Sequence, residues 1–153
     1  MKILDILPPT NVIADLKGTS KLEILQELAG VLADNQPSIS KQRLIDVLLE
    51  REKLGSTAIG EGIAIPHGKL PKLPGVVAAF GRSQGGVDFQ SLDGGKTQLF
   101  FLLVAPEEAS GAHLKALARV SRLLRDKDFR ARLLSAPDAS AIHQTIREED
   151  DKY

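Results

Sequence analysis

The chain contains no cysteine among its 153 residues. This absence excludes disulfide bonds, thiolate metal sites and cysteine nucleophiles, and it is compatible with a reducing cytoplasm. Aromatic residues make up only 4% of the sequence, which argues against a surface on which nucleic-acid bases stack. Lysine plus arginine and aspartate plus glutamate both total 20. No basic excess therefore exists to neutralise a phosphate backbone, and we expect no nucleic-acid partner.

Long hydrophobic runs are also missing. The longest, LFFLLVA at residues 99–105, is about a third of the length of a membrane span. The N-terminal stretch MKILDILPPT carries an early aspartate and two prolines, unlike a secretory signal peptide. We therefore expect a soluble, cytoplasmic protein with no direct membrane insertion.

Several motifs of common enzyme sites do not occur in the sequence. There is no HExxH motif and no paired-histidine spacing that would suggest zinc. Neither GxxxxGK[ST] nor GxGxxG is present, so nucleotide binding has no signature, and no GxSxG elbow supports a serine hydrolase. We expect neither a metal nor a cofactor.

Apolar residues at helical spacing predict helices at both ends of the chain, over residues 20–35, 40–53, 110–126, 128–136 and 138–150. Ser20 and Glu23 match a capping box, Ser40 is the expected cap of the second helix, and Gly55 suits the position after its last turn. The side chains expected to line up on these helices are Leu22, Leu25, Leu28, Ala29, Leu32, Leu44, Val47, Leu48, Leu114, Leu117, Val120 and Leu124. The charged end EEDDKY is expected to fray.

The middle of the chain predicts strands. Residues 76–82 and 98–106 are nearly continuous apolar runs, as in strands buried on both faces. A short strand is expected at 63–65, and another within the glycine-bounded stretch 84–96. Helices, then strands, then helices indicate one α/β domain over residues 1–153, with a small central sheet covered by helices.

The stretch GIAIPHGKL, residues 62–70, contains the most distinctive chemistry. Pro66 fixes one backbone dihedral before His67, and Gly68 is expected to let the chain turn away and leave space beside the ring. A neutral imidazole is a good nucleophile near pH 7 and can form a phosphoramidate on nitrogen. A histidine nucleophile at the end of a short strand is one interpretation.

Two residues could supply an anion site beside it. Arg51, near the end of the second helix, could bind two phosphate oxygens with its guanidinium group. His113 lies in the first turn of the third helix, where free N–H groups attract anions and the helix dipole favours a neutral ring.

Each residue also has a structural interpretation that the pattern leaves open. His67 could pack in a turn, Arg51 could be a solvated helix charge paired with Glu50 or Glu52, and His113 could be an ordinary helix-start residue. His143 has no supporting context and is interpreted as a surface residue.

The string LEREKLGSTAIGEGIAIPHGK, residues 49–69, strongly resembles the active-site region of enzyme IIA proteins of the bacterial phosphotransferase system, mannitol/fructose class. The resemblance is to the nitrogen-regulatory branch in particular. It extends over nearly the whole chain, including LFFLLVAP and AHLKALARVSRLL. It implies a IIA (type 2) domain with a mixed β-sheet flanked by helices.

The resemblance also implies roles for three residues. His67 corresponds to the family's phosphorylated histidine, His113 to its second active-site histidine and Arg51 to its active-site arginine. The implied function is a phosphoryl carrier that accepts its phosphate from a small HPr-like phosphohistidine protein, with no metal in the scheme. Leu54, Ile59, Ile63 and Leu70 are candidates for an apolar docking patch around His67.

Two functional classes follow from the resemblance. In the first, the protein is a regulator whose phosphorylation state decides which target proteins it binds. In the second, it is a sugar-specific component that passes phosphate to a IIB domain for fructose- or mannitol-type uptake. A degenerate module that no longer accepts phosphate is disfavoured, because all three expected site residues are present.

Overall fold

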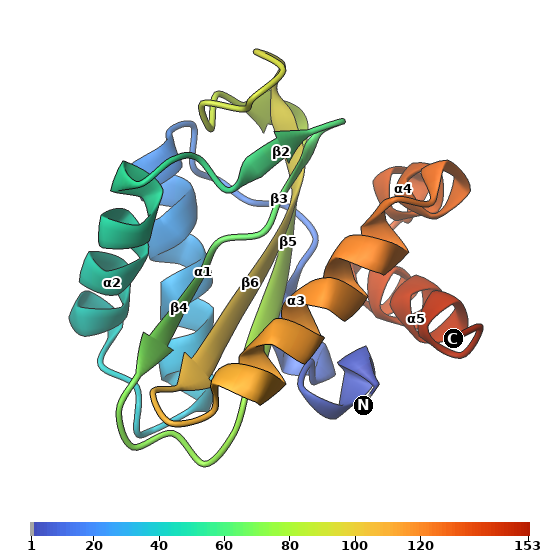
Figure 1. The fold of residues 1–153 in the computed structure, drawn as a ribbon. Helices are drawn as coiled ribbons and strands as arrows, with labels where there is room; N and C mark the ends of the chain where they lie inside the picture. The colour runs from blue at the N-terminus through green and yellow to red at the C-terminus, as the bar shows by residue number, and fades with distance from the viewer. Residues whose placement is uncertain (1) are drawn as a thin grey trace.

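The computed structural model describes residues 2–153, which form one α/β domain of five α-helices, two short 3₁₀ helices and a six-stranded mixed sheet (Figure 1). The 3₁₀ helices are η1 (Ile3–Asp5) and η2 (Pro9–Asn11). The α-helices are α1 (Lys21–Asn35), α2 (Lys41–Lys53), α3 (Ser110–Leu124), α4 (Lys127–Ser135) and α5 (Ala139–Asp150). The strands are β1 (Val12–Ile13), β2 (Ala58–Gly60), β3 (Ile63–Ala64), β4 (His67–Leu70), β5 (Val77–Val87) and β6 (Thr97–Pro106).

Strand β6 is the centre of the sheet. On one side it pairs antiparallel with β5, which in turn pairs parallel with β1. On its other side β6 pairs parallel first with β3 and then with β4. Strand β2 continues the sheet beyond β3 in an antiparallel pairing. The sheet is therefore mixed and small, as the resemblance implied.

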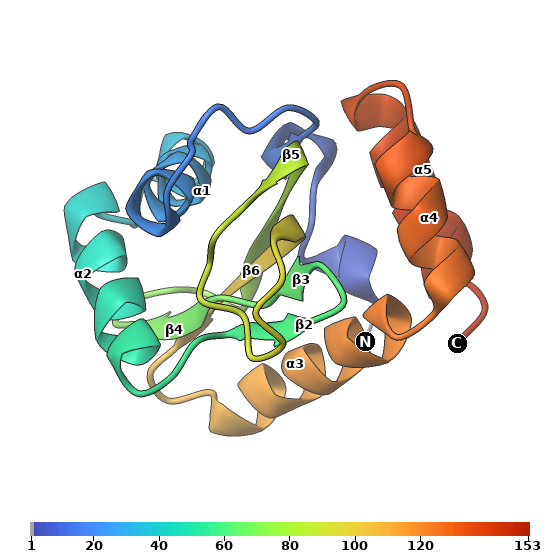
Figure 2. The same cartoon turned by 90° about the horizontal axis from the view of Figure 1, so that it is seen from above.

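Two helical layers cover the two faces of this sheet (Figures 1 and 2). Phe100, Leu102 and Val104 of β6 pack in one buried cluster with α1 and α2. The intervening residues Leu99, Phe101 and Leu103 pack in a second cluster with α3, α4 and α5. Successive strand residues point to opposite faces, so a strand covered on both sides must be apolar throughout. This explains the continuous apolar run.

The predicted starts of the first two helices are confirmed. The Ser20 hydroxyl accepts a hydrogen bond from the Glu23 amide at 3.2 Å, and the Ser40 hydroxyl accepts one from the Arg43 amide at 3.3 Å. The prediction of which α1 side chains face the core was partly wrong, because Leu22 is exposed and Ile24 is fully buried in its place. Both residues are apolar, so the choice between them is made by the sheet against which α1 packs.

The glycine-rich middle of the chain differs from the prediction. Residues 84–96 do not contain a separate strand, because β5 continues through Gly85 and Gly86 to Val87. The pairing register with β6 shifts between Arg82 and Val87. Glycines can follow such an irregularity without steric cost, so these two lie inside a long strand rather than at its boundary.

The charged C-terminal end was predicted to fray, but its first half, residues 148–150, belongs to α5, and only the exposed residues 151–153 lie beyond the helix. Asp150 is 1% exposed and accepts hydrogen bonds from the Arg119 guanidinium at 2.9 Å and from the Leu4 amide at 3.2 Å. The carboxylate thus ties the end of α5 to α3 and to the start of the chain. These contacts join residues far apart in sequence, so the local charge pattern cannot reveal them.

Candidate functional site

His67 is the first residue of β4 and shares a hollow with Arg51 of α2 and His113 of α3. Strand β4 lies at the edge of the sheet (Figure 2). His67 pairs with Leu103 of β6, whose amide donates to the Pro66 carbonyl at 3.0 Å. The expectation of a turn was therefore wrong: the chain continues as a strand through Gly68. A Cβ atom on Gly68 would lie 2.6 Å from Val47 Cγ1 of α2. Glycine is needed here because α2 packs closely against β4.

The hydrogen bonds of the His67 ring assign its two nitrogens. Nδ1 lies 2.8 Å from the Ile65 carbonyl oxygen, which can only accept, so Nδ1 carries the proton. Nε2 lies 3.3 Å from Arg51 Nε, which can only donate, so Nε2 presents its lone pair. The half-buried ring is thus held in the tautomer whose nucleophilic atom is Nε2.

Arg51 lies in the last turn of α2, and its second contact orients the guanidinium group. Its terminal nitrogen donates to the Gly55 carbonyl at 2.9 Å, while Nε faces His67. The alternative that Arg51 is paired with a neighbouring glutamate was wrong. Glu50 pairs with Lys53, and Glu52 pairs with Lys21.

His113 brings the second imidazole to the site from the opposite helical layer. Its ring centroid lies 5.4 Å from that of His67, and the two planes are inclined at 77°. The side chain is buried, and within the described residues its Nε2 has no hydrogen-bond partner. Ala109, which precedes α3, has no side-chain oxygen that could cap the helix. The amides at the start of α3 are therefore available to an anion.

The surroundings favour the neutral form of both imidazoles. The pKa of His67 lies below its ordinary value, mainly because burial disfavours the charged ring. The Arg51 charge lowers this pKa further, whereas the hydrogen bond to Ile65 and the charge of Glu52 raise it without cancelling the effect of burial. Burial also lowers the pKa of His113, and so do repulsion from His67 when that ring is protonated and the charge of Lys69. A neutral His67 retains the lone pair that a nucleophile requires.

The three residues share one hollow of about 390 Å³, lined also by Gly68, Lys69, Ser110, Leu114 and Leu117. Sequence reasoning missed Lys69 and Ser110, whose ammonium and hydroxyl groups lie 2.9 Å apart across the gap between β4 and α3. Lys69 lies inside the string 49–69, two residues after His67, and this was the available signal.

Of the four side chains predicted to form an apolar patch around His67, Leu54 and Ile59 are exposed. Ile59 does not line the hollow that contains His67 but a separate one beside Leu124 and Arg130. Ile63 and Leu70 are buried and belong to the two cores instead. Leu114 is exposed at the edge of the hollow, although its spacing in α3 had grouped it with inward-facing leucines.

His143 lies away from this site, and its interpretation as a surface residue was wrong. It is buried, and its Nε2 lies 3.0 Å from the Leu7 carbonyl oxygen. This contact joins α5 to the N-terminal segment over a sequence separation of 136 residues. The ring therefore has a structural role away from His67.

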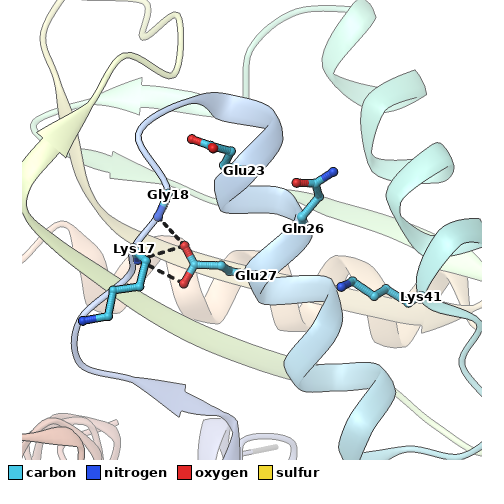
Figure 3. Close-up of a pocket in the computed structure, with 6 residues that line it drawn as sticks. All are labelled: Lys17, Gly18, Glu23, Gln26, Glu27 and Lys41. Atoms are coloured by element: carbon cyan, nitrogen blue, oxygen red, sulfur yellow. Dashed lines mark hydrogen bonds between the residues drawn. The ribbon is translucent and has the colours of Figure 1, made fainter.

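A second hollow lies at the start of α1 (Figure 3). It is lined by Lys17, Gly18, Glu23, Gln26, Glu27 and Lys41. The backbone N–H groups of Lys17 and Gly18 donate to the Glu27 carboxylate. Because a carboxylate of the protein already uses these amides, this hollow does not offer them to an anion.

Within residues 2–153, no three or more histidine, aspartate or glutamate side chains are grouped so that they could hold a metal ion. No helix in the same range has both the length and the apolar character needed to cross a bilayer.

Comparisons with a family profile, with curated proteins and with solved structures all match the chain to IIA proteins of the phosphotransferase system. A profile of the family described as "Phosphoenolpyruvate-dependent sugar phosphotransferase system, EIIA 2" matches residues 5–149. A nitrogen regulatory protein of Bradyrhizobium diazoefficiens is 47% identical over 146 residues, covering 95% of each chain. The fructose-specific EIIABC component of Bacillus subtilis is 38% identical over 150 residues, covering 98% of this chain and 24% of that protein.

Among solved structures, the nitrogen regulatory protein IIA-Ntr from Neisseria meningitidis matches with a TM-score of 0.88 and 33% identity. The match covers 94% of this chain and 98% of that one. The likeness thus extends over both helical layers and the sheet edge at which His67, Arg51 and His113 meet.

Proposed function

Because the chain belongs to the EIIA 2 family of the phosphoenolpyruvate-dependent sugar phosphotransferase system, we propose that it is a phosphoryl carrier that uses His67. Proteins of this family take phosphate from a phosphocarrier and pass it to partner proteins. In the proposed reaction, Nε2 of His67 attacks the phosphorus atom of a phosphohistidine on an HPr-like donor.

The observation that carries the proposal is the tautomer of His67. Its Nε2 lone pair points at a guanidinium group, and its Nδ1–H is held by the Ile65 carbonyl. In the transfer, the donor's phosphohistidine ring carries a proton on its other nitrogen, so its N–P bond breaks with the electron pair returning to a neutral donor imidazole, and the Nε2 lone pair forms the new P–Nε2 bond. The positive charge passes to the His67 ring, which keeps its proton on Nδ1 and its hydrogen bond to Ile65.

The remaining groups stabilise charge. Phosphoryl transfer depends mainly on in-line positioning and on stabilising the negative charge spread over the phosphoryl oxygens. Arg51 and His113 lie on either side of His67, and the free amides at the start of α3 add partial positive charge. The proposal assigns phosphate stabilisation to Arg51 and His113.

We further propose a regulatory role, in the cytoplasm, over a role in sugar uptake. The match to a nitrogen regulatory protein covers 95% of both chains at 47% identity. Phosphorylation adds roughly −1.5 to −2 charges to a surface, and here that surface carries the exposed apolar side chains Leu54 and Leu114. Such a change can strengthen or abolish binding of a target protein.

A sugar-specific role is the second candidate, favoured by the 38% identity to the fructose-specific component over 98% of this chain. The two roles differ in the final acceptor. Addition of a IIB protein and fructose or mannitol to the labelled protein should yield no sugar phosphate if the protein is a regulator. Formation of sugar phosphate would support the second role.

The central experiment is labelling with radioactive phosphoenolpyruvate, enzyme I and an HPr-like carrier. The wild-type protein should take up acid-labile, base-stable label, and His67→Ala should take up none. His143→Gln is the matched control, since it keeps a donor for the Leu7 carbonyl and should label normally. Labelling that survives in His67→Ala would refute the site. A pull-down with wild type, His67→Ala and the charge-mimicking His67→Glu then tests for state-dependent target binding.

A further inference from the structure

A buried ion pair lies beside the His67 site and takes no direct part in the proposed transfer. Glu52 follows Arg51 in α2, and its carboxylate lies 2.7 Å from Lys21 Nζ at the start of α1. Glu52 is only 8% exposed. Burying an ion pair is often no more stabilising than packing apolar side chains of similar size. A gain in stability is therefore a weak explanation for the Glu52–Lys21 pair. The other contacts of the Glu52 carboxylate indicate a different role.

The Glu52 carboxylate holds the loop that connects α2 to β2. One of its oxygens accepts the Thr57 backbone N–H at 3.1 Å, and the other accepts the Thr57 hydroxyl. Within this loop, the Gly55 carbonyl accepts a hydrogen bond from the Arg51 guanidinium at 2.9 Å. Anchoring the loop at Thr57 therefore fixes the carbonyl that orients Arg51.

A second chain of hydrogen bonds leads from the same threonine to the nucleophile. The Thr57 carbonyl accepts the Ile65 N–H at 3.1 Å. The Ile65 carbonyl in turn accepts Nδ1–H of His67 at 2.8 Å. Both the guanidinium and the imidazole are thus connected to one residue, and the buried carboxylate of Glu52 holds that residue in place.

We propose that Glu52 and Thr57 are positioning residues for phosphoryl transfer. Their paired hydrogen bonds, here called the Glu52–Thr57 clamp, keep His67 in the Nδ1–H tautomer and keep Arg51 directed at Nε2. This inference rests on the proposed function, since it assumes that Nε2 is the phosphorylated atom. When the clamp opens, the Ile65 carbonyl can move, and the ring can adopt the tautomer in which Nε2 carries the proton and cannot attack.

The first test compares two substitutions of the threonine. Thr57→Val keeps the shape but removes the hydroxyl, and it should slow the labelling of His67 about tenfold, because a small displacement of reacting groups is costly. Thr57→Ser keeps the hydroxyl and should restore most of the rate. Glu52→Gln, which keeps the size but removes the charge, should slow labelling as well.

The matched control is Asp150→Asn. Asp150 is likewise a buried carboxylate that binds a cation and a backbone amide, but it ties α5 to α3 and to the N-terminal segment. This variant should lower the urea midpoint of unfolding and leave the labelling rate unchanged. Slowing equal to that of Thr57→Val would mean that general destabilisation explains both, and it would overturn the proposal.

The second test reads the tautomer directly and needs no phosphoryl donor. Long-range nitrogen–proton NMR spectra of the imidazole rings should show His67 protonated on Nδ1 in the wild type and as a mixture of tautomers in Thr57→Val. An unchanged tautomer in that variant overturns the proposal, whatever its labelling rate. If the wild type takes up no label, the proposed function fails, and these spectra still decide whether the clamp controls the ring.

Discussion

Removing the Arg51 guanidinium should slow the phosphorylation of His67 without unfolding the protein. Arg51 is half-buried, and its contacts are the His67 ring and the Gly55 carbonyl rather than a carboxylate. The charge is therefore free to interact with an incoming phosphoryl group. A hydrogen bond to a charged partner contributes about 1.5–3 kcal/mol, which corresponds to about a tenfold to a hundredfold change in rate.

The assay is the initial rate of labelling from a phosphorylated HPr-like carrier, measured for Arg51→Ala and Arg51→Lys. Lysine keeps the charge but cannot bind two oxygens at once, so it should recover only part of the rate. Arg43→Ala is the matched control, because it removes an exposed arginine from the same helix, two turns earlier. A rate in Arg51→Ala equal to that in Arg43→Ala would refute the role assigned to this guanidinium.

Two further predictions concern the imidazoles. The pKa values of His67 and His113 lie below the ordinary value, chiefly because the partial burial of His67 and the burial of His113 disfavour the charged ring. Labelling should therefore be independent of pH above about 6.5 and slow only below it. Near and below pH 6.5, these two histidines bind more protons in the unfolded chain than in the folded chain. The urea midpoint of unfolding should therefore fall as the pH drops below about 6.5, and it should not change between neutral and mildly alkaline pH. His113→Phe should leave the free protein at least as stable, because it removes a buried nitrogen without a partner. It should also slow labelling about tenfold or more, and a wild-type rate would exclude His113 from the site.

The parts of the fold that follow from local sequence are those whose physical cause is local. Ser20 and Ser40 begin helices because a side-chain oxygen three residues before an amide can cap it, and this needs no tertiary contact. The apolar run of β6 likewise indicates a strand covered on both faces. The faces of the helices were less predictable: Leu22 and Leu114 fit an apolar stripe by spacing and are exposed in the structure.

In the site, too, some features follow from local sequence and others depend on tertiary packing. His67 and Arg51 are 16 residues apart in one recognisable string, and they are in hydrogen-bond contact. The reason for Gly68 could not be predicted, since the close approach of Val47 depends on how α2 packs on β4. The contact of Lys69 with Ser110 spans 41 residues and joins two layers, so no local pattern contains it.

The position of the site at the sheet edge explains how groups from opposite faces can meet. Strand β4 pairs with β6 along one side, and within the described residues no strand pairs with its other side. α2 belongs to one core and α3 to the other, yet past this open side Arg51 and His113 reach the same ring. In the middle of the sheet, the backbone would separate them. Edge placement also leaves the His67 ring half-buried, in a hollow that it shares with Arg51 and His113. A change of packing in either core therefore moves Arg51 or His113 relative to His67 and leaves the other in place.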